Sequence, residues 1–417
     1  MEKIIIENFG GLKKMEFELK NINILIGPQA SGKSMTVKLL YFFKTFTSEI
    51  IKSIENGESK RTLDSKQREK FSNYFPKESW PQGNFRIRYV SNETWISIER
   101  KSSKSLNFNY SENLVKMISR GRKFLKDEQK KVDLERRIGS FRANRNMRNR
   151  FNECLKNEFS EILSYNQFFI PAGRSFFANI QSSIFSFLSN NKSLDPFLIE
   201  FGSFYDSFKR FSLDEDSEED KKNNKVFNKV INDIMSGSYK REKEKDFIVH
   251  NDTRKVNLAS ASSGQQEILP LILVLKVLSG INFINGGATL YIEEPEAHLF
   301  PTAQKKIVKL LARTFNSQNS NFQIIVTTHS PYILSSFNNL LEGGKIIEDD
   351  NKKSNKVYEV IPEKEILHPN DLIAYSIFNG KKQNLMDEET KLISQNILDS
   401  VSDEISMDFG KLLDIEF

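Results

Sequence analysis

A glycine-rich turn near the amino end carries the residue types that bind phosphate. Residues 27–34 follow the pattern G-x-x-x-x-G-K-S and come directly after the apolar run 22–26. The glycines let successive backbone N–H groups face phosphate oxygens, and the helix expected next adds the positive end of its dipole. Lys33 is expected to reach the outer phosphates, and the Ser34 hydroxyl to bind Mg²⁺. The loop residues predicted to contact a nucleotide are Gly27, Ala30, Ser31, Gly32, Lys33, Ser34 and Met35.

Two adjacent carboxylates end a later apolar strand. Residues 290–292 are Leu-Tyr-Ile, and Glu293 and Glu294 follow directly. Because successive side chains of a strand point in different directions, the two carboxylates can serve different tasks. We assign Glu293 to Mg²⁺, bound directly or through water, and Glu294 to the attacking water as general base. The pair therefore predicts hydrolysis of the bound nucleotide.

A histidine ends the next apolar strand. His329 comes directly after the run 323–328, and a parallel sheet would bring it to the same edge as Glu293. We expect His329 to face the γ-phosphate. The catalytic residues predicted from the sequence are thus Lys33, Glu294 and His329.

A second turn with a serine and a glycine precedes an apolar helix expected from residue 268. Such a turn at a helix amino end also binds phosphate. Because the sequence has one complete phosphate loop, we expect this turn to act on a nucleotide held by another copy of the chain. The residues predicted to do so are Ser262, Ser263, Gly264 and Gln265. The alternative is an ordinary helix cap made by Ser263.

These four motifs, in this order, resemble those of the ABC-class ATPases of the SMC, RecF and OLD group. The resemblance covers residues 1–48 and 246–335, and residues 169–175 resemble a segment of compact OLD-like, PtuA-like ATPase subunits of bacterial antiphage defence systems. It implies ATP and Mg²⁺ as cofactors. It also implies a glutamine that senses the γ-phosphate, for which Gln167 and Arg174 are the candidates. The serine turn departs from the Leu-Ser-Gly-Gly-Gln form, which leaves open whether Ser262 or Ser263 touches the nucleotide.

The resemblance implies an α/β fold, a P-loop ABC-ATPase head with a mixed sheet that is interrupted by a largely helical insertion. We predict that residues 1–48 and 246–361 form this head. Residues 49–245 are predicted to form a β-lobe and a helical, basic insertion, and residues 362–417 a helical tail. Strands are expected over 3–8, 13–19, 21–26, 85–90, 94–100, 106–110 and 167–170.

Positive charge is concentrated in one part of the insertion. Residues 116–150 hold 13 Lys and Arg against 4 Asp and Glu. Such a segment is typical of contact with a nucleic-acid backbone. The alternatives are a solvated helical surface, or pairing with the acidic run 214–220.

The remaining composition favours a cytoplasmic protein without a membrane span. The most apolar stretch, 268–275, is far shorter than the roughly 20 residues that cross a bilayer. The amino end lacks a signal-peptide pattern, and the single cysteine, Cys154, cannot form a disulfide within the chain.

The resemblance further implies an ATP-driven switch in which a homodimer sandwiches two ATP molecules. The leading interpretation is an ATPase, converting ATP and water to ADP and phosphate, that controls a separate nuclease or toxin effector in a bacterial antiphage defence or DNA-surveillance complex. The alternative is a RecF- or SMC-like DNA-repair clamp that acts by ATP-dependent DNA binding. No nuclease domain is expected in this chain, because the 86 residues after Pro331 contain no D-x-D pair.

Overall fold

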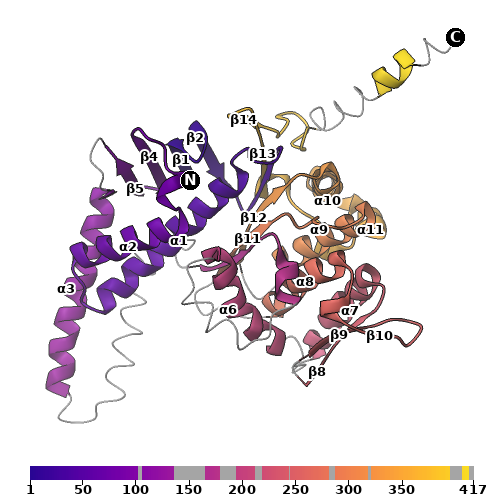
Figure 1. Ribbon diagram of the computed structural model, residues 1–417, viewed down its shortest axis with the longest axis horizontal. Coiled ribbons are helices and arrows are strands. Elements are labelled where there is room, and N and C mark those ends of the chain that lie inside the picture. The colour runs from indigo at the N-terminus through magenta and orange to yellow at the C-terminus, as the bar shows by residue number, and fades with distance from the viewer. Residues whose placement is uncertain are drawn as a thin grey trace.

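Two large sheets and the helices around them form the body of the protein (Figure 1). The computed structural model describes residues 1–101, 106–135, 165–178, 194–211, 218–243, 245–280, 287–317, 321–394 and 406–412. Part of the predicted basic segment, from 136 to 150, lies outside the described residues, as does most of the acidic run 214–220.

The main sheet has six strands in the order β14-β13-β3-β12-β11-β7. Its parallel strands are β3 (Ile22–Ile26), β7 (Asn166–Ile170), β11 (Gly287–Glu293), β12 (Asn321–Thr328) and β13 (Leu372–Phe378), and β14 (Lys381–Asn384) closes one edge antiparallel. All residues of β3 and β11 are buried, which explains why these strands read as continuous apolar runs. The parallel strands bring their carboxyl ends to one edge.

The second sheet is antiparallel, in the order β2-β1-β4-β5-β6. Its strands are β1 (Glu2–Phe9), β2 (Leu12–Leu19), β4 (Phe85–Ser91), β5 (Thr94–Arg100) and β6 (Asn107–Tyr110). Burial alternates along β1, where Ile4 and Ile6 are fully buried, because only one face of this sheet meets the core. The described residues also include a small antiparallel sheet of β8 (Ser238–Glu242), β9 (Lys245–Val249) and β10 (Lys255–Asn257).

Helix α1 (Lys33–Glu55) packs between the two large sheets and is buried around most of its surface. Successive side chains of a strand point to opposite faces of the sheet, so the core forms two clusters, one on each face of the main sheet. Leu25 and Ile325 share a cluster with α1, whereas Ile24 and Val326 point to the opposite face. That face is covered by α8 (Ser263–Gly280), α9 (Pro301–Phe315) and α10 (Pro331–Asp349). The main sheet is thus enclosed between helices.

Further helices complete the molecule. With the antiparallel sheet, on the left of Figure 1, lie α2 (Lys60–Tyr74) and α3 (Glu112–Glu135). At the lower centre lies α6 (Pro196–Phe211), and on the right lie α7 (Glu218–Met235) and α11 (Ser354–Val360). Among the described residues, none of the helices is both long and apolar enough to cross a bilayer.

The predicted domain boundaries differ from the structure in three places. The boundary at residue 48 falls inside α1, and β4 of the predicted β-lobe pairs with β1 in one sheet. The predicted insertion also supplies β7 to the main sheet. The helical tail over 362–417 is wrong for its first part, because β13 pairs with β3. A fully buried strand has no alternation of polar and apolar residues, so its period does not distinguish it from a helix.

Candidate nucleotide-binding site

The predicted phosphate loop connects β3 to α1 at the carboxyl edge of the main sheet. Gly32 has φ +98°, a conformation that favours glycine, and it directly precedes the first residue of α1. A Cβ at Gly27 would come within 2.2 Å of the Ile377 carbonyl oxygen on β13. Gly32 is therefore needed for its conformation and Gly27 for the close approach of β13. The sequence did not predict β13, which packs against the loop.

Lys33 lies inside this loop. Its Nζ donates hydrogen bonds to the carbonyls of Gly27 at 2.7 Å and Pro28 at 2.8 Å, and the side chain is buried. Burial lowers the pKa of Lys33, and the charges of Glu294 and Glu296 oppose that shift. The carboxylates whose charges act on this ammonium both follow β11, which is separated from β3 by β12.

Glu293 ends β11 beside the start of α1 and is 5% exposed. Burial raises its pKa, which the charge of Lys38 and the Ser34 hydroxyl partly offset. Its Oε2 accepts a hydrogen bond from the Ala172 N–H at 3.4 Å, whereas its buried Oε1 has no hydrogen-bond partner among the described residues. An unpaired carboxylate oxygen next to a serine hydroxyl fits a hard cation such as Mg²⁺.

The described residues contain no cluster of three or more His, Cys, Asp or Glu side chains that could hold a metal by themselves. Mg²⁺ bound together with a nucleotide needs only one or two protein ligands, because phosphate oxygens and water fill its other positions. Ser34 and Glu293 are the residues that would hold it.

Glu294 and His329 form a pair at the same edge. The His329 Nε2 lies 3.3 Å from the Glu294 Oε1, and the two side chains are 30% and 37% exposed, respectively. The Glu294 N–H donates a hydrogen bond to the Thr327 carbonyl at 2.9 Å, which extends the pairing of β11 with β12 by one residue. Its φ of +44° lies in the left-handed region, so the strand ends here. A non-glycine residue in this conformation stores on the order of 1 kcal/mol of strain, which is common at functional sites. The turn separates the half-exposed Glu294 from the buried Glu293.

Glu296 fixes the position of His329, a role that the sequence did not indicate. Its Oε1 accepts hydrogen bonds from the His329 N–H at 2.6 Å and the Thr328 hydroxyl at 2.7 Å. The carboxylate therefore ties the turn after β11 to the turn after β12. The sequence feature that could have indicated this role is the position of Glu296, three residues after Glu293.

Neither candidate for the γ-phosphate sensor lies in a position to act as one. Gln167 pairs with Thr289 in the register of β7, several residues before the carboxyl end of β11, and accepts a hydrogen bond from the Tyr291 hydroxyl at 2.7 Å. Arg174 is fully buried. Its guanidinium donates to the carbonyls of Pro171, Glu293, Glu294 and Glu267 at 2.7 to 3.0 Å. Arg174 thus holds the backbone that carries the two carboxylates.

Glu267 connects this arginine to the serine turn. It lies in the second turn of α8, is 1% exposed, and its Oε1 is 3.2 Å from the Arg174 Nη2. It also accepts hydrogen bonds from the N–H groups of Arg174 at 2.9 Å and Ser175 at 2.8 Å. One buried ion pair therefore joins the beginning of α8 to the ends of β7 and β11. The sequence signal was a lone acid at the start of an apolar helix.

The serine turn caps α8, but from a different residue than the alternative predicted. Helix α8 begins at Ser263, and the Oγ of the preceding Ser262 accepts a hydrogen bond from the Gln265 N–H at 3.4 Å. Ser263 is exposed. A Cβ at Gly264 would come within 2.7 Å of the His298 carbonyl, so the turn packs against the segment that follows Glu294. Ser262 rather than Ser263 therefore makes the cap.

We expect removal of the buried arginine to destabilise the fold strongly. Arg174→Ala would leave the buried Glu267 carboxylate without its counter-charge, which costs about 3–5 kcal/mol in the free energy of unfolding. Arg254→Ala is the matched control, because its ion pair with Asp252 is exposed, and it should leave the free energy of unfolding nearly unchanged. Urea unfolding monitored by circular dichroism measures both. Equal losses for the two variants would show that the buried pair has no special importance.

The family comparison agrees with the fold and the loop. Residues 22–335 match the model of the family described as AAA domain, putative AbiEii toxin, Type IV TA system. The match covers about three quarters of the chain, and the chain belongs to this family. It is a P-loop ATPase by its family and by its loop, and the resemblance of its motifs to the SMC, RecF and OLD group is consistent with this. The likeness to PtuA-like subunits stays a prediction.

Curated relatives share a shorter region. The Retron Ec83 probable ATPase of Escherichia coli is 34% identical over 94 residues, which cover 21% of this chain and 17% of that protein. The Retron Vc95 probable ATPase of Vibrio cholerae serotype O1 biovar El Tor is 30% identical over 109 residues, 25% of this chain and 20% of that protein. The chain thus spans a fifth or less of the length of these relatives. Among solved structures, the SmcHead bound to the C-winged helix domain of ScpA aligns with a TM-score of 0.41 at 12% identity, over 92% of this chain and 95% of that one.

Proposed function

We propose that the chain is an ATP-hydrolysing switch subunit of a bacterial antiphage defence or DNA-surveillance complex. The observation that carries the proposal is the meeting of the phosphate loop, Glu293 and the Glu294–His329 pair at one edge of the sheet. The family membership and the retron ATPase relatives support a role in defence. In this proposal the chain controls a separate effector protein, a nuclease or a toxin.

Each site residue has a chemical task in this proposal. Lys33 turns from the loop carbonyls to the outer phosphates, and Ser34 and Glu293 hold Mg²⁺. When bound, Mg²⁺ neutralises charge on the phosphate oxygens. Glu294 accepts a proton from the attacking water, and His329 lies beside it. The half-exposed position of Glu294 gives water access to its carboxylate.

The switch arises because ATP binds the paired state of two chains more tightly than the separate chains. Ligand binding moves an equilibrium only by the difference in its affinity for the two states. The exposed Ser263 would contact the nucleotide of the partner, completing a site that one chain cannot complete alone. The Arg174–Glu267 pair would connect that contact to the carboxylates of its own chain.

Assembly tests this proposal. With ATP and the hydrolysis-blocked variant Glu294→Gln, we expect a stable dimer in sedimentation experiments, because the nucleotide persists between the chains. Adding Ser263→Arg should prevent the dimer by steric and charge conflict. An unchanged mass distribution with and without ATP would exclude the sandwich.

We also propose that the basic segment 116–150 contacts a nucleic-acid backbone. Its described part lies on α3, where Lys123, Lys126 and Lys130 are exposed at helical spacing. Neutralising Arg142, Arg145, Arg148 and Arg150 should reduce the salt dependence of binding to duplex DNA by up to about 0.9 log unit per lost phosphate contact. An unchanged affinity and salt slope for duplex, single-stranded DNA and tRNA would contradict this contact.

A further inference from the structure

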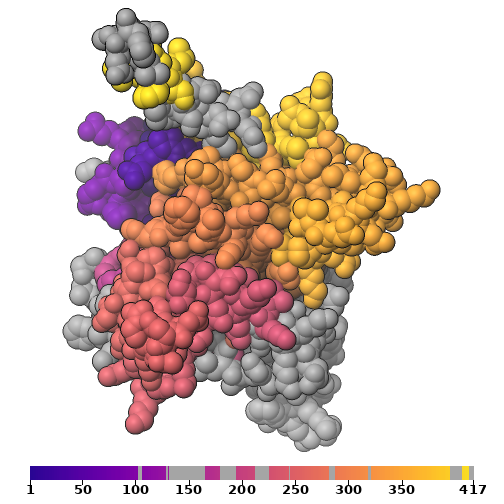
Figure 2. All heavy atoms as spheres, turned by 90° about the vertical axis from the view of Figure 1, so that its right-hand side faces the viewer, coloured from indigo at the N-terminus to yellow at the C-terminus, as the bar shows by residue number. Residues whose placement is uncertain are grey.

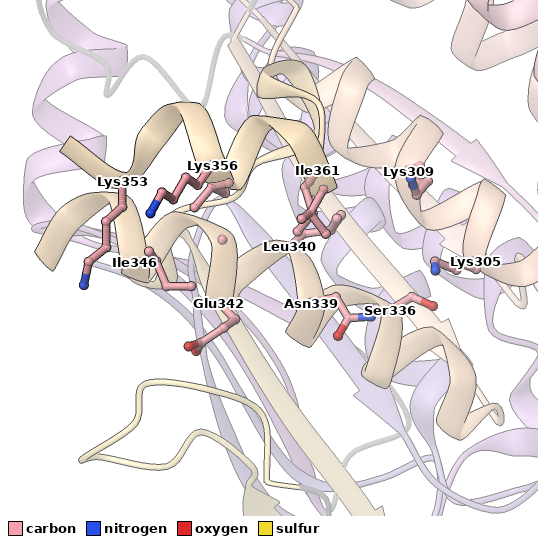
Figure 3. A pocket seen from close by; sticks show the side chains of 13 residues that line it. Lys305, Lys309, Ser336, Asn339, Leu340, Glu342, Ile346, Lys353, Lys356 and Ile361 are labelled. Atoms are coloured by element: carbon pink, nitrogen blue, oxygen red, sulfur yellow. The ribbon is translucent and has the colours of Figure 1, made fainter. Parts of the chain in front are cut away.

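A groove lies between α9, α10 and α11, on the side of the main sheet away from α1. These helices are on the right of Figure 1, and that side faces the viewer in Figure 2. The groove has a volume of about 600 Å³, with Leu340, Val357 and Ile361 among its apolar lining residues. Figure 3 shows Lys305 and Lys309 on one side of it and Lys353 and Lys356 on the other. It combines an apolar floor with a basic rim.

The rim retains most of its positive charge. Lys309 pairs with Glu365 at 3.0 Å. Lys305, Lys353 and Lys356 are exposed and form no ion pair with any described residue, and Glu342 is the one acidic residue among those that line the groove. A ligand for this groove therefore needs an apolar face together with negative charge.

The carboxyl-terminal segment of the same chain has both properties. Residues 395–417 contain six Asp and Glu and one Lys. Apolar residues recur in it at the spacing of one helix face, at Leu398, Val401, Ile405, Phe409 and Leu412. If the whole segment were helical, Asp399 would flank this apolar stripe on one side, and Glu404 and Asp408 on the other.

The part of the segment that the structure describes leaves its apolar side chains uncovered. Residues 406–412 are helical and lie away from the body at the upper right of Figure 1. Phe409 is 62% and Leu412 is 63% exposed. Large apolar side chains grouped on one face of an exposed helix indicate a surface that covers them.

The segment begins at the helix that forms the groove. The Ile393 carbonyl accepts a hydrogen bond from the Asn338 side chain of α10 at 2.7 Å, and its N–H donates to the same side chain at 2.8 Å. The next residue of α10, Asn339, lines the groove. Successive residues of a helix lie about 100° apart, so an arc of about 9 Å separates Asn338 from Asn339 on a helix of about 10 Å diameter, and residues 394–397 can span up to about 13 Å. We propose that residues 398–412 dock as an amphipathic helix in the groove of their own chain.

Hydrogen exchange of the full chain without ATP tests this docking. We expect the amides of 398–412 to be protected, and Lys353→Glu with Lys356→Glu to speed their exchange about fivefold, because two partly exposed ion pairs are lost. Glu404→Lys with Asp408→Lys should do the same. Combining all four substitutions should restore protection, since it re-forms the pairs with their signs exchanged. The control Lys13→Glu with Lys14→Glu makes the same change of charge on exposed residues of β2 and should have no effect.

Three results would overturn the proposal. The first is that the amides of 398–412 in the unmodified chain exchange their hydrogens as fast as those of an unstructured peptide. The second is that they also exchange fast in the variant that carries all four substitutions. The third is protection that appears only as protein concentration rises, because it would place the segment in the groove of a second copy. ATP hydrolysis is not needed for any of these measurements, so the outcome is independent of the proposed function.

Discussion

Glu294→Gln is expected to lose ATP turnover while keeping ATP binding. Removing the general base should lower kcat by about 10²- to 10⁴-fold, because the attacking water no longer transfers its proton to a positioned carboxylate. Binding should persist, since the Lys33 and Ser34 contacts are intact and glutamine has nearly the same shape. Phosphate release gives the rate, and titration with a fluorescent ATP analogue gives the affinity.

A matched control separates the position of Glu294 from the loss of a negative charge. Glu359 is exposed on α11, and Glu359→Gln should leave turnover unchanged. Wild-type turnover in Glu294→Gln would show that another group activates the water. In that case His329, 3.3 Å away, is the next residue to substitute.

Lys33→Ala is expected to lose ATP binding itself. The ammonium is the cation that the loop offers to the outer phosphates, and a hydrogen bond to a charged group contributes about 1.5–3 kcal/mol. The dissociation constant for ATP should therefore rise by at least about tenfold and by up to about 100-fold. Lys13→Ala, on the exposed edge strand β2, is the control. An unchanged affinity in Lys33→Ala would mean that the nucleotide binds elsewhere.

The sequence predicted those parts of the site that directly follow a buried strand in the chain. The loop follows β3 directly, and Glu293, Glu294 and His329 follow the buried strands β11 and β12. Because these strands are parallel, their carboxyl ends meet, and the side chains come together as expected. The roles assigned to these residues stay predictions.

The sequence did not predict contacts that depend on distant segments. Arg174 and Glu267 are 93 residues apart, and no local pattern relates an arginine after β7 to an acid in α8. The same holds for β13, which joins the sheet beside β3 although 345 residues separate Ile26 from Leu372 in the sequence. All residues of β13 except the last are buried, so its sequence does not alternate between polar and apolar residues and fits a buried helix as well as a buried strand. Only the tertiary structure decides between them.

The central claim is that two chains together complete each ATP site, and mixing two inactive variants tests it most directly. Lys33→Ala has a defective loop and an intact serine turn, and Ser263→Arg has the reverse. In a mixed dimer, the intact turn of the first variant meets the intact loop of the second, so one of the two sites is complete. Mixing should then restore ATP turnover to as much as about half of the wild-type rate, because ATP pairs neither variant with itself and each mixed dimer has one complete site of two. Turnover of the mixture no higher than the mean of the two variants measured separately would contradict the shared site.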